Sequence, residues 1–327
     1  MTKPTDEFKT ISKYFAPLSA AESGAFNLTD DAAVIEPPEG QSLVVTTDAL
    51  VAGVHFLPND PPADIAAKLL RVSLSDLAAM GAKPAHYSLS LAVSSDLTED
   101  WLSAFSAGLA LDQKEFGVTL IGGDTVSAAG PLTLSLTAMG YVEKGKALRR
   151  SEAQIGDDIW VSGTIGDGAL GLLIANEKMN DLAADKREYL LMRYRRPLPQ
   201  LTLGQKLIGH ARGTIDISDG LIADLGHICE TSNVGADIQI TAIPLSEAAK
   251  EALEMDPKIL DLVLGGGDDY ELLFTADASF ETMSKSVVSE VGVALTKIGT
   301  ITKGTAIRLF YENGSEHRID QTGFTHF

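Results

Sequence analysis

The sequence has one cysteine, a shortage of basic residues and no long apolar run, and each shortage excludes a class of protein. Cys229 alone cannot form an internal disulfide, which fits a reducing compartment. No apolar run approaches the roughly 20 residues that span a bilayer, and residues 1–7 contain no apolar signal core. We therefore expect a cytoplasmic protein that is not associated with a membrane.

Charge and motif content narrow the field further. Lysine and arginine number 26 against 45 aspartate and glutamate residues, for a formal net charge of −19, which argues against nucleic acid as a partner. No Cys-His spacing typical of zinc sites occurs. The Walker motif G-x-x-x-x-G-K-[ST] and the protein-kinase loop motifs are also absent. Any bound nucleotide would be held by metal ions and glycine-rich loops rather than by a Walker lysine.

A length of 327 residues predicts about two domains, each large enough for its own core. After a short helix over 5–17, the hydrophobic pattern predicts a buried strand from Leu43, a helix to Gly81, a strand over 87–93, a helix over 98–117 and strands over 118–121 and 131–142. This β-α-β-α-β-β order indicates an α+β domain. The basic connection over 144–150 marks the boundary, so we expect domains at 1–145 and 146–327, the second of α/β type.

Carboxylates stand at the expected ends of strands and on the apolar stripe of one helix. Three of the positions have a plainer explanation: Asp76 can turn to water, Gly122-Gly123-Asp124 is a good turn sequence, and Ser218 or Asp219 can cap a helix, although capping does not explain Asp216. The carboxylates in question are Asp30 and Asp31 in a polar loop leading to a short strand near Ile35, Asp48 after Thr46-Thr47 at the end of a strand, Asp76, Asp124, and Asp216 with Asp219.

Several converging carboxylates require cations between them. Two carboxylates about 4 Å apart repel by roughly 4 kcal/mol at an effective dielectric constant near 20. All-oxygen ligands indicate a hard ion, Mg²⁺ or alternatively Mn²⁺ or Ca²⁺. Because Mg²⁺ sites with few protein ligands usually complete their shells with substrate phosphates, this composition favours a nucleotide enzyme.

A second glycine-rich pattern is less informative. Gly166, Gly168 and Gly171 match G-x-G-x-x-G, but the second strand with a terminal acidic residue that a dinucleotide site requires does not follow. The segment is then either a plain helix N-terminus or one that faces phosphate.

Five dispersed segments resemble the thiamine-monophosphate kinase family, which is grouped with aminoimidazole ribonucleotide synthetase-like proteins. The resemblance implies an α+β N-terminal domain that binds ATP and metal and pairs across a homodimer, and an α/β C-terminal domain. It also implies transfer of the γ-phosphoryl group of ATP to thiamine monophosphate, with several Mg²⁺ ions. The segments are Thr46–Phe56, Ser73–Ala82, Ile121–Thr125, Asp216–Leu221 and Gly266–Leu272.

The resemblance also implies a role for individual residues. No residue is expected to act as a general base, because the acceptor phosphate is already ionised and the transfer is direct and in line. The implied ATP contacts are Gly123, Asp124, Arg150 and Ser218. The implied acceptor contacts are His55, Asp268 and a tail residue, Gln321 or Phe324. The implied metal ligands are Asp31, Thr46, Thr47, Asp48, Asp76, Asp124, Asp216 and Asp219.

The chain departs from the family pattern at three places. Asn27-Leu28-Thr29 replaces Gly-x-Gly, Asp268 replaces the usual glutamate, and Gln321 replaces an aromatic residue for which Phe324 is a substitute. Selenophosphate synthetases and hydrogenase-maturation relatives need a cysteine near one terminus, which Cys229 does not supply. An aminoimidazole ribonucleotide synthetase would share the ATP site but not the Val51–Phe56 segment. A metal-binding protein without catalysis would leave Arg150 and the glycine-rich loops unexplained.

Overall fold

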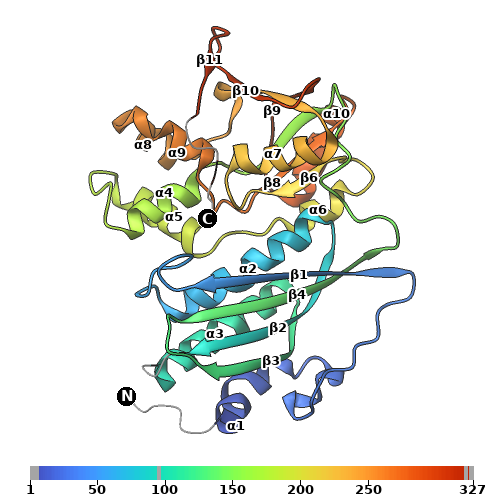
Figure 1. The fold of residues 1–327 in the computed structure, drawn as a ribbon, viewed down its shortest axis with the longest axis vertical. Coiled ribbons are helices and arrows are strands. Elements are labelled where there is room, and N and C mark those ends of the chain that lie inside the picture. Colours follow the sequence, from blue (N-terminus) through green and yellow to red (C-terminus); the bar gives the residue numbers. More distant parts are fainter. Residues whose placement is uncertain (1–6, 94–96, 320–322, 324–327) are drawn as a thin grey trace. The chain divides into compact units, whose positions relative to one another are not determined.

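The structure, a computed structural model, describes residues 7–93, 97–319 and 323. It contains two compact units, residues 1–77 with 82–145 and residues 78–81 with 146–327. We call them the N-terminal and C-terminal units (Figure 1). Residues 78–81 hold the end of a helix that begins in the N-terminal unit. Among the described residues, no helix combines the length and apolar character that crossing a bilayer requires.

The N-terminal unit is built on a sheet of order β1-β4-β2-β3. The β2–β3 pair is parallel, and the β1–β4 and β2–β4 pairs are antiparallel. The predicted β-α-β-α-β-β order is confirmed. Its elements are α1 (Glu7–Thr10), a π-helical turn (Ile11–Phe15), 3₁₀ segments (Ala16–Ser19 and Ser23–Leu28), β1 (Gln41–Val51), α2 (Pro62–Ala79), β2 (Lys83–Val93), α3 (Glu99–Phe116), β3 (Thr119–Ser127) and β4 (Thr133–Glu143).

Local sequence explains where α3 begins and ends. The hydroxyl of Thr98 accepts a hydrogen bond from the Trp101 N–H at 3.2 Å, which satisfies one of the free donors of the first turn. Gly117 ends the helix in the left-handed conformation, with φ of 68°, where a side chain would be strained. These are the two ends that the sequence predicts.

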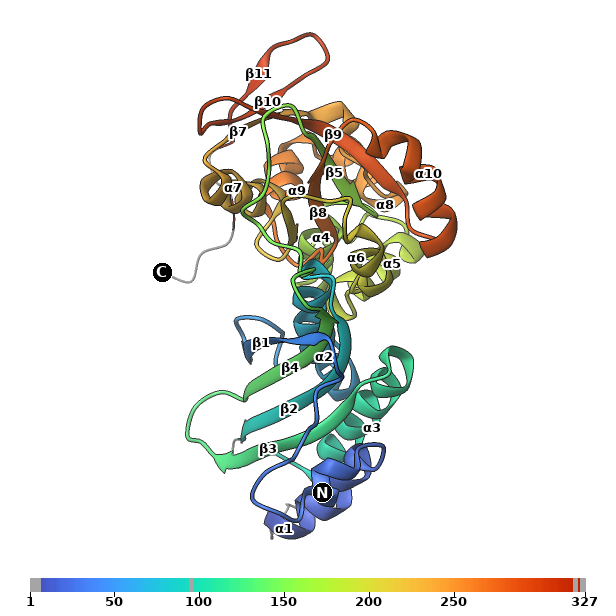
Figure 2. The ribbon, with the colours of Figure 1, turned by 90° about the vertical axis from the view of Figure 1, so that its right-hand side faces the viewer.

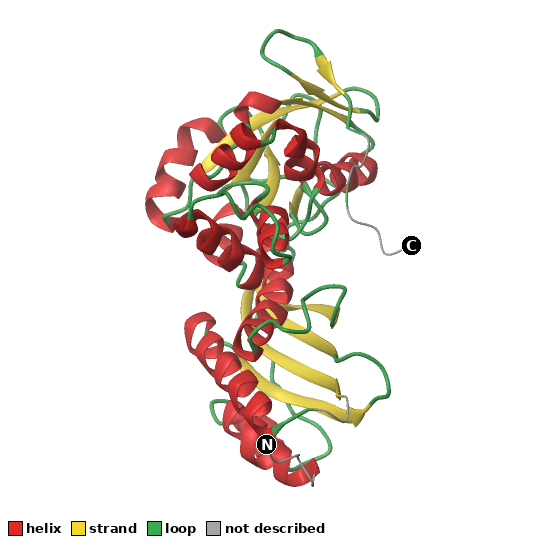
Figure 3. Cartoon of the chain, turned by 90° about the vertical axis from the view of Figure 1, so that its left-hand side faces the viewer, coloured by secondary structure: helices red, strands yellow, loops and turns green. Residues whose placement is uncertain are grey.

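Alternate residues of the N-terminal sheet face different surroundings. Helices α2 and α3 cover one face (Figures 2 and 3), on which Leu50, Leu89 and Leu136 are buried. On the opposite face of β1, Leu43 is 48% exposed and Val45 is 54% exposed. The expectation of a buried strand is therefore wrong for this face, because no helix of the described unit covers it.

Three strand boundaries also differ from the prediction. β1 continues to Val51, so Thr46-Thr47-Asp48 lies inside the strand instead of at its end. β3 runs through Gly122-Gly123-Asp124, which is therefore not a turn. Residues 33–38 form no strand. Pairing with β4 and β2 extends the first two segments, and a polar local sequence does not prevent it.

The C-terminal unit contains a sheet of order β11-β10-β7-β9-β5-β8-β6. Its pairs are antiparallel except for β7–β10, so the unit mixes helices and strands as expected but its sheet is not the parallel type. Its elements are β5 (Asp158–Ser162), α4 (Asp167–Ala175), α5 (Ala184–Arg195), α6 (Leu201–Leu207), β6 (Thr214–Asp216), α7 (Leu221–Ser232), β7 (Gly235–Gln239), a 3₁₀ turn (Ile240–Ala242), α8 (Glu247–Met255), a second 3₁₀ turn (Pro257–Ile259), α9 (Leu260–Gly265), β8 (Leu272–Ala276), α10 (Phe280–Val291), β9 (Leu295–Thr302), β10 (Ile307–Phe310) and β11 (Glu316–His317).

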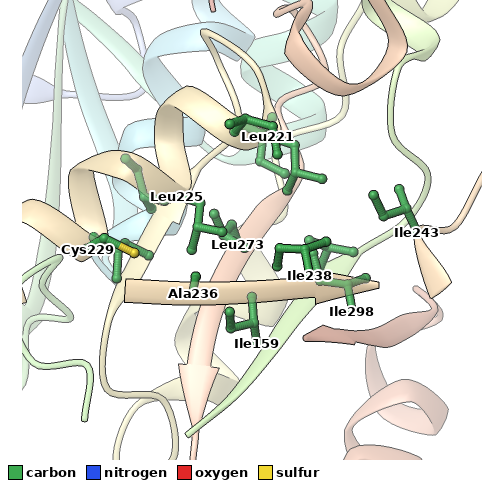
Figure 4. Packing of buried hydrophobic residues seen from close by; sticks show 14 of the residues in the cluster. Ile159, Leu221, Leu225, Cys229, Ala236, Ile238, Ile243, Leu273 and Ile298 are labelled. Atoms are coloured by element: carbon green, nitrogen blue, oxygen red, sulfur yellow. The ribbon is translucent and has the colours of Figure 1, made fainter. Parts of the chain in front are cut away.

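Helix α7 supplies one side of the main core of this unit. Leu221, Leu225 and Cys229 face the buried strand residues Ile159 and Leu273 (Figure 4). Cys229 is 2% exposed and acts as a small core residue, as predicted. The helix and strand ends that carry polar motifs are therefore held by a continuous apolar core.

Candidate functional site

Four polar side chains meet where β1 packs against α2. Ser73 Oγ of α2 donates to Asp48 Oδ2 of β1 at 2.6 Å, and Thr46 Oγ1 of β1 donates to Asp76 Oδ2 of α2. Residues two apart on a strand and three apart on a helix share a face, so both pairs occupy one interface. The structure thus brings together two predicted metal ligands, Asp48 and Asp76. Asp76 itself is half-buried, and Thr46 binds one of its carboxylate oxygens.

Burial and neighbouring groups act on Asp48 in opposite directions. Burial raises the pKa of the Asp48 carboxyl, while the Ser73 hydroxyl and the charge of His55 lower it. The backbone N–H of Val51 donates to His55 Nδ1 at 3.0 Å. His55 Nδ1 is therefore engaged by the backbone of the strand that precedes it.

Thr47 points to the other face of the sheet. Its Oγ1 lies 2.8 Å from Thr137 Oγ1, and its side chain is exposed. Strand alternation places it opposite Thr46 and Asp48. To bind the same metal ion as Thr46 and Asp48 within this unit, Thr47 would have to use its backbone carbonyl oxygen.

A cavity of about 240 Å³ brings the acidic loop of residues 30–31 to β3. Asp31, Gly123 and Asp124 line it together with Asp30, and apolar side chains such as Phe15 form the rest. These are a predicted metal ligand and two predicted ATP contacts, joined in one hollow of the N-terminal unit.

Residue 123 must be a glycine because the neighbouring strand β2 passes very close to it. β3 has one extra residue relative to β2 between Leu120 and Gly122, a bulge that redirects the residues after it. A Cβ on Gly123 would lie 1.9 Å from the carbonyl oxygen of Leu89, whereas a Cβ on Gly122 would meet no atom within 4 Å. Strand spacing alone therefore requires glycine at position 123.

In the C-terminal unit, backbone hydrogen bonds join the segments 216–221 and 266–272. The N–H of Asp268 donates to the Ser218 carbonyl at 2.9 Å, and the N–H of Tyr270 donates to the Ile217 carbonyl at 2.8 Å. A Cβ on Gly267 would lie 2.1 Å from the Ser218 oxygen. The structure thus places a predicted ATP contact, Ser218, beside a predicted acceptor contact, Asp268.

The turn before α7 is held by a carboxylate that sequence reasoning missed. Asp224 Oδ2 accepts the N–H groups of Asp219 and Gly220, each at 3.1 Å. Gly220 occupies the N-cap position, so the expected cap by Ser218 or Asp219 is wrong. An acidic residue in the first turn of an apolar helix was the signal that could have identified it.

Asp219 and Asp224 also approach a histidine. Asp219, Asp224 and His227 each have one potential ligand atom, and these three atoms lie within 4.8 Å of one another. Among the described residues, this is the group of acidic and histidine side chains that could hold a metal ion. Burial, and then the charge of Asp219, raise the pKa of Asp224 to about 7, while the charge of Arg150 lowers it. Arg150, a predicted ATP contact, therefore lies within electrostatic range of this turn. Asp216 is buried at the end of β6, as predicted.

The glycine-rich segment at the start of α4 is already in use by the protein. The N–H groups of Gly166 and Gly168 donate to the carboxylate of Asp269 at 2.7 Å and 2.9 Å. These amides therefore do not face phosphate, and of the two alternatives the plain helix N-terminus describes the structure. Asp269 was missed because it neighbours Asp268 in the same motif.

The predicted residues are divided between the two units, each described separately. Asp31, Thr46, Thr47, His55 and other members belong to the N-terminal unit, and Arg150, Asp216, Ser218, Asp219 and Asp268 belong to the C-terminal unit. Gln321 and Phe324 lie outside the described residues.

Comparison with known proteins gives the chain its family. Residues 29–142 match the model of the AIR synthase related protein, N-terminal domain, and residues 154–312 match that of its C-terminal domain. The thiamine-monophosphate kinase of Escherichia coli (strain K12) is 41% identical over 322 residues, which cover 98% of each chain. This chain belongs to the thiamine-monophosphate kinase family.

Solved structures of the thiamine-monophosphate kinase family share the fold. The crystal structure from Stenotrophomonas maltophilia K279a has a TM-score of 0.80 at 44% identity, covering 86% of this chain and 89% of that chain. The structure of AaThiL complexed with AMPPCP and TMP has a TM-score of 0.78 at 29% identity, covering 94% of this chain and 98% of that one. The AIR synthase-like architecture is thereby established for both halves.

One departure from the thiamine-monophosphate kinase pattern has a structural outcome. Where Gly-x-Gly is usual, Asn27 at the first glycine position and Leu28 at the middle position have positive φ angles of 54° and 57°, whereas Thr29 at the second glycine position has a φ of −107°. Phe26, just before them, has a φ of 50°. The left-handed backbone that glycine favours is therefore present without glycine at the first of the two glycine positions, at some cost in strain.

Proposed function

We propose that this protein transfers the γ-phosphoryl group of ATP to thiamine monophosphate, forming thiamine diphosphate and ADP. The observation that carries the proposal is the 41% identity with the Escherichia coli kinase over 98% of both chains. The complex of AaThiL with AMPPCP, an ATP analogue, and TMP supports both substrates. A single buried cysteine fits our assignment of the reaction to the cytoplasm.

The cavity beside β3 suits the nucleotide. Apolar side chains such as Phe15 and Leu120 form part of its wall, and Asp31 and Asp124 line it with Gly123. An adenine ring can occupy the apolar part, with its phosphates directed to the carboxylates through cations. We assign Gly123, Asp124, Arg150 and Ser218 to ATP.

The donor set fits Mg²⁺, because every proposed ligand atom is oxygen. Two of the carboxylates, Asp48 and Asp76, are already oriented by hydroxyl groups at the β1–α2 interface. When bound, Mg²⁺ would neutralise phosphate charge and align the reacting oxygens. The proposed ligands are Asp31, Thr46, Thr47, Asp48, Asp76, Asp124, Asp216 and Asp219.

We assign His55 and Asp268 to the acceptor, with Gln321 or Phe324 of the tail. His55 follows β1, and the Val51 N–H holds its ring by donating to Nδ1. The Asp268 carboxylate is held by the Tyr270 hydroxyl at 3.1 Å and suits the positive charge of thiamine.

The acceptor needs no protein base, since a phosphate monoester loses its second proton at about pH 6. The protein's task is to hold two phosphates in line. We therefore propose direct transfer without a phosphoenzyme. ATP made chiral at the γ-phosphorus should yield inverted product, and retention would require a phosphorylated side chain.

The exposed face of the N-terminal sheet supports a homodimer. Leu43 and Val45 are about half exposed on the edge strand β1, and a second copy would cover them. Val45→Glu should convert a dimer to a monomer in sedimentation velocity. Leu111→Glu, at a residue of α3 that is 64% exposed, is the matched control and should remain dimeric. A wild-type monomer at micromolar concentration would contradict this.

The function itself is tested by ADP release from ATP and Mg²⁺, with and without thiamine monophosphate. We expect release to depend on the acceptor. Asp48→Asn and Asp76→Asn should abolish turnover and weaken Mg²⁺ binding in calorimetry while the fold is kept, because each removes one oxyanion from a like-charged site. Asp100→Asn, at an exposed carboxylate of α3, should change neither. Acceptor-independent ADP release would refute the proposal.

A further inference from the structure

A buried charged network lies against the 266–270 loop, and none of the roles assigned above includes it. Arg193 of α5 is at its centre, and its Nη2 donates to Glu271 Oε1 at 2.9 Å and to the Asp269 carbonyl at 3.1 Å. Its Nε lies 3.9 Å from Asp167 Oδ2. All four residues are buried, from 0% exposure at Asp167 to 8% at Arg193. We call Arg193, Asp167, Asp269 and Glu271 the buried network.

The network attaches the loop to the segment that joins β5 and α4. The Asp269 carboxylate accepts the N–H groups of Gly166 and Gly168, at 2.7 Å and 2.9 Å. The Glu271 carboxylate accepts the Ser162 hydroxyl at 2.5 Å. Two side chains that are two residues apart in sequence are thus fixed to the same neighbouring segment. Arg193 bridges the Glu271 carboxylate and the Asp269 backbone carbonyl.

The residues between and beside these anchors have strained backbones. Asp268 has a φ of 71° and Tyr270 a φ of 54°, in the left-handed region that non-glycine residues rarely adopt. Such conformations persist only where the surroundings enforce them. The Tyr270 hydroxyl donates to Asp268 Oδ1 at 3.1 Å, so this backbone determines where the Asp268 carboxylate points.

The charge balance of the network is poor for stability alone. Three carboxylates surround one guanidinium, and burial raises the pKa of Asp269 to about 8 and also raises the pKa of Glu271. Replacing buried ion groups by apolar side chains is often neutral or stabilising. Arg193 can, however, bridge a side chain and a backbone carbonyl at fixed geometry, which an apolar side chain cannot do.

We propose that Arg193 is a positioning residue of the acceptor site, which acts through Asp269 and Glu271 to hold Asp268 toward thiamine monophosphate. The inference rests on the proposed function, and in particular on the assignment of Asp268 to the acceptor. It adds residues outside the acceptor contacts to the determinants of acceptor affinity. Of the proposed ATP contacts, Ser218 accepts the Asp268 N–H through its backbone carbonyl, whereas Gly123 and Asp124 belong to the N-terminal unit and are not part of this loop. ATP binding should therefore respond less than acceptor binding.

The test compares KM for the two substrates in steady-state assays of the full chain with Mg²⁺. Arg193→Met should raise KM for thiamine monophosphate about tenfold or more and leave KM for ATP within about twofold. Arg193→Lys, which keeps the charge but not the two-point geometry, should recover part of the loss. If Arg193→Met does not fold, Glu271→Gln provides the same comparison, because it keeps the shape but removes the charge that Arg193 faces.

A matched control and a double variant separate positioning from general destabilisation. Arg308→Met removes another two-point ion pair of the same unit, with Asp237 at 2.8 Å, and should leave both KM values unchanged. In the double variant Arg193→Met/Asp268→Ala, the acceptor KM should equal that of Asp268→Ala alone, since one residue acts through the other.

Equal losses for ATP and thiamine monophosphate, or full additivity in the double variant, would overturn the inference while leaving the proposed function in place. Wild-type protein without acceptor-dependent turnover would overturn both.

Discussion

Replacing Gly123 by alanine tests whether the packing of β3 against β2 prepares the nucleotide cavity. In the structure the new Cβ would lie 1.9 Å from the Leu89 carbonyl oxygen, whereas a Cβ atom essentially never lies within 3.0 Å of a non-bonded heavy atom. That oxygen belongs to the backbone and cannot rotate away. The two strands must therefore separate by more than about 1 Å, which exceeds what an optimal N–H···O bond can absorb.

The size of the effect follows from this displacement. Forcing a methyl group into a packed site costs about 1–3 kcal/mol. Two neighbouring interstrand hydrogen bonds, each worth about 1 kcal/mol net, would lengthen or break. We expect Gly123→Ala to lower the free energy of unfolding of the N-terminal unit by about 3–5 kcal/mol. Gly122→Ala should be neutral or stabilise by up to about 1 kcal/mol, because its Cβ meets no atom within 4 Å.

The two tryptophans allow this unit to be followed separately. Trp101 lies in α3 of the N-terminal unit, stacked on Phe105, and Trp160 lies in β5 of the C-terminal unit. In a Trp160→Phe background, urea unfolding monitored by fluorescence reports Trp101 alone. The same variants are assayed for KM of ATP, which should rise for Gly123→Ala because the residue lines the cavity.

Two outcomes would refute the reasoning. If Gly123→Ala and Gly122→Ala are equally stable, the close approach of the strands is not what requires glycine. If Gly123→Ala is fully stable and yet loses ATP binding, glycine is required by the ligand and not by the sheet.

Two further predictions concern buried charges. Arg71 and Asp112 form a two-point ion pair at 2.7 Å and 2.8 Å that joins α2 to α3. Arg71→Met should lower the free energy of unfolding by about 3–5 kcal/mol, because it leaves Asp112 without this partner. In urea unfolding, Arg71→Met/Asp112→Leu should be more stable than Arg71→Met, and a less stable double variant would contradict this. Burial raises the pKa of Asp269 from 3.8 to about 8, with Asp167 raising it and Arg193 lowering it, so this group takes up a proton on folding and its contribution to stability falls as pH rises across that window. From about pH 5.5 to about pH 8.5, the urea midpoint of the wild type should therefore fall more than that of Asp269→Asn. An equal fall of the midpoint in both proteins would contradict this.

Local sequence predicted the order of the elements well because their signals are local. The period of apolar residues distinguishes a strand from a helix without knowledge of the fold. Thr98 and Gly117 determine the ends of α3 through hydrogen bonds and dihedral angles of their own neighbourhood. The dispersed motifs that resemble the thiamine-monophosphate kinase family are likewise readable from the chain alone, and the full-length identity agrees with them.

The extent of β1 and β3 could not be predicted from local sequence, since pairing with other strands decides it. Thr46-Thr47-Asp48 resembles a strand end because it is polar, yet β4 continues to pair beyond it, to Val51. Alternation shows that Thr46 and Asp48 share a face and that Thr47 does not, but it cannot say which face a helix covers. That depends on where α2 packs.

The sequence by itself therefore determined the family, the element order and most of the polar residues proposed to bind substrates or metal ions. Tertiary structure alone decided which groups those residues meet. The Asp269 carboxylate, for example, accepts the amides of Gly166 and Gly168, about a hundred positions away in the chain. A buried carboxylate needs hydrogen-bond donors, and which donors it finds is set by how distant segments pack.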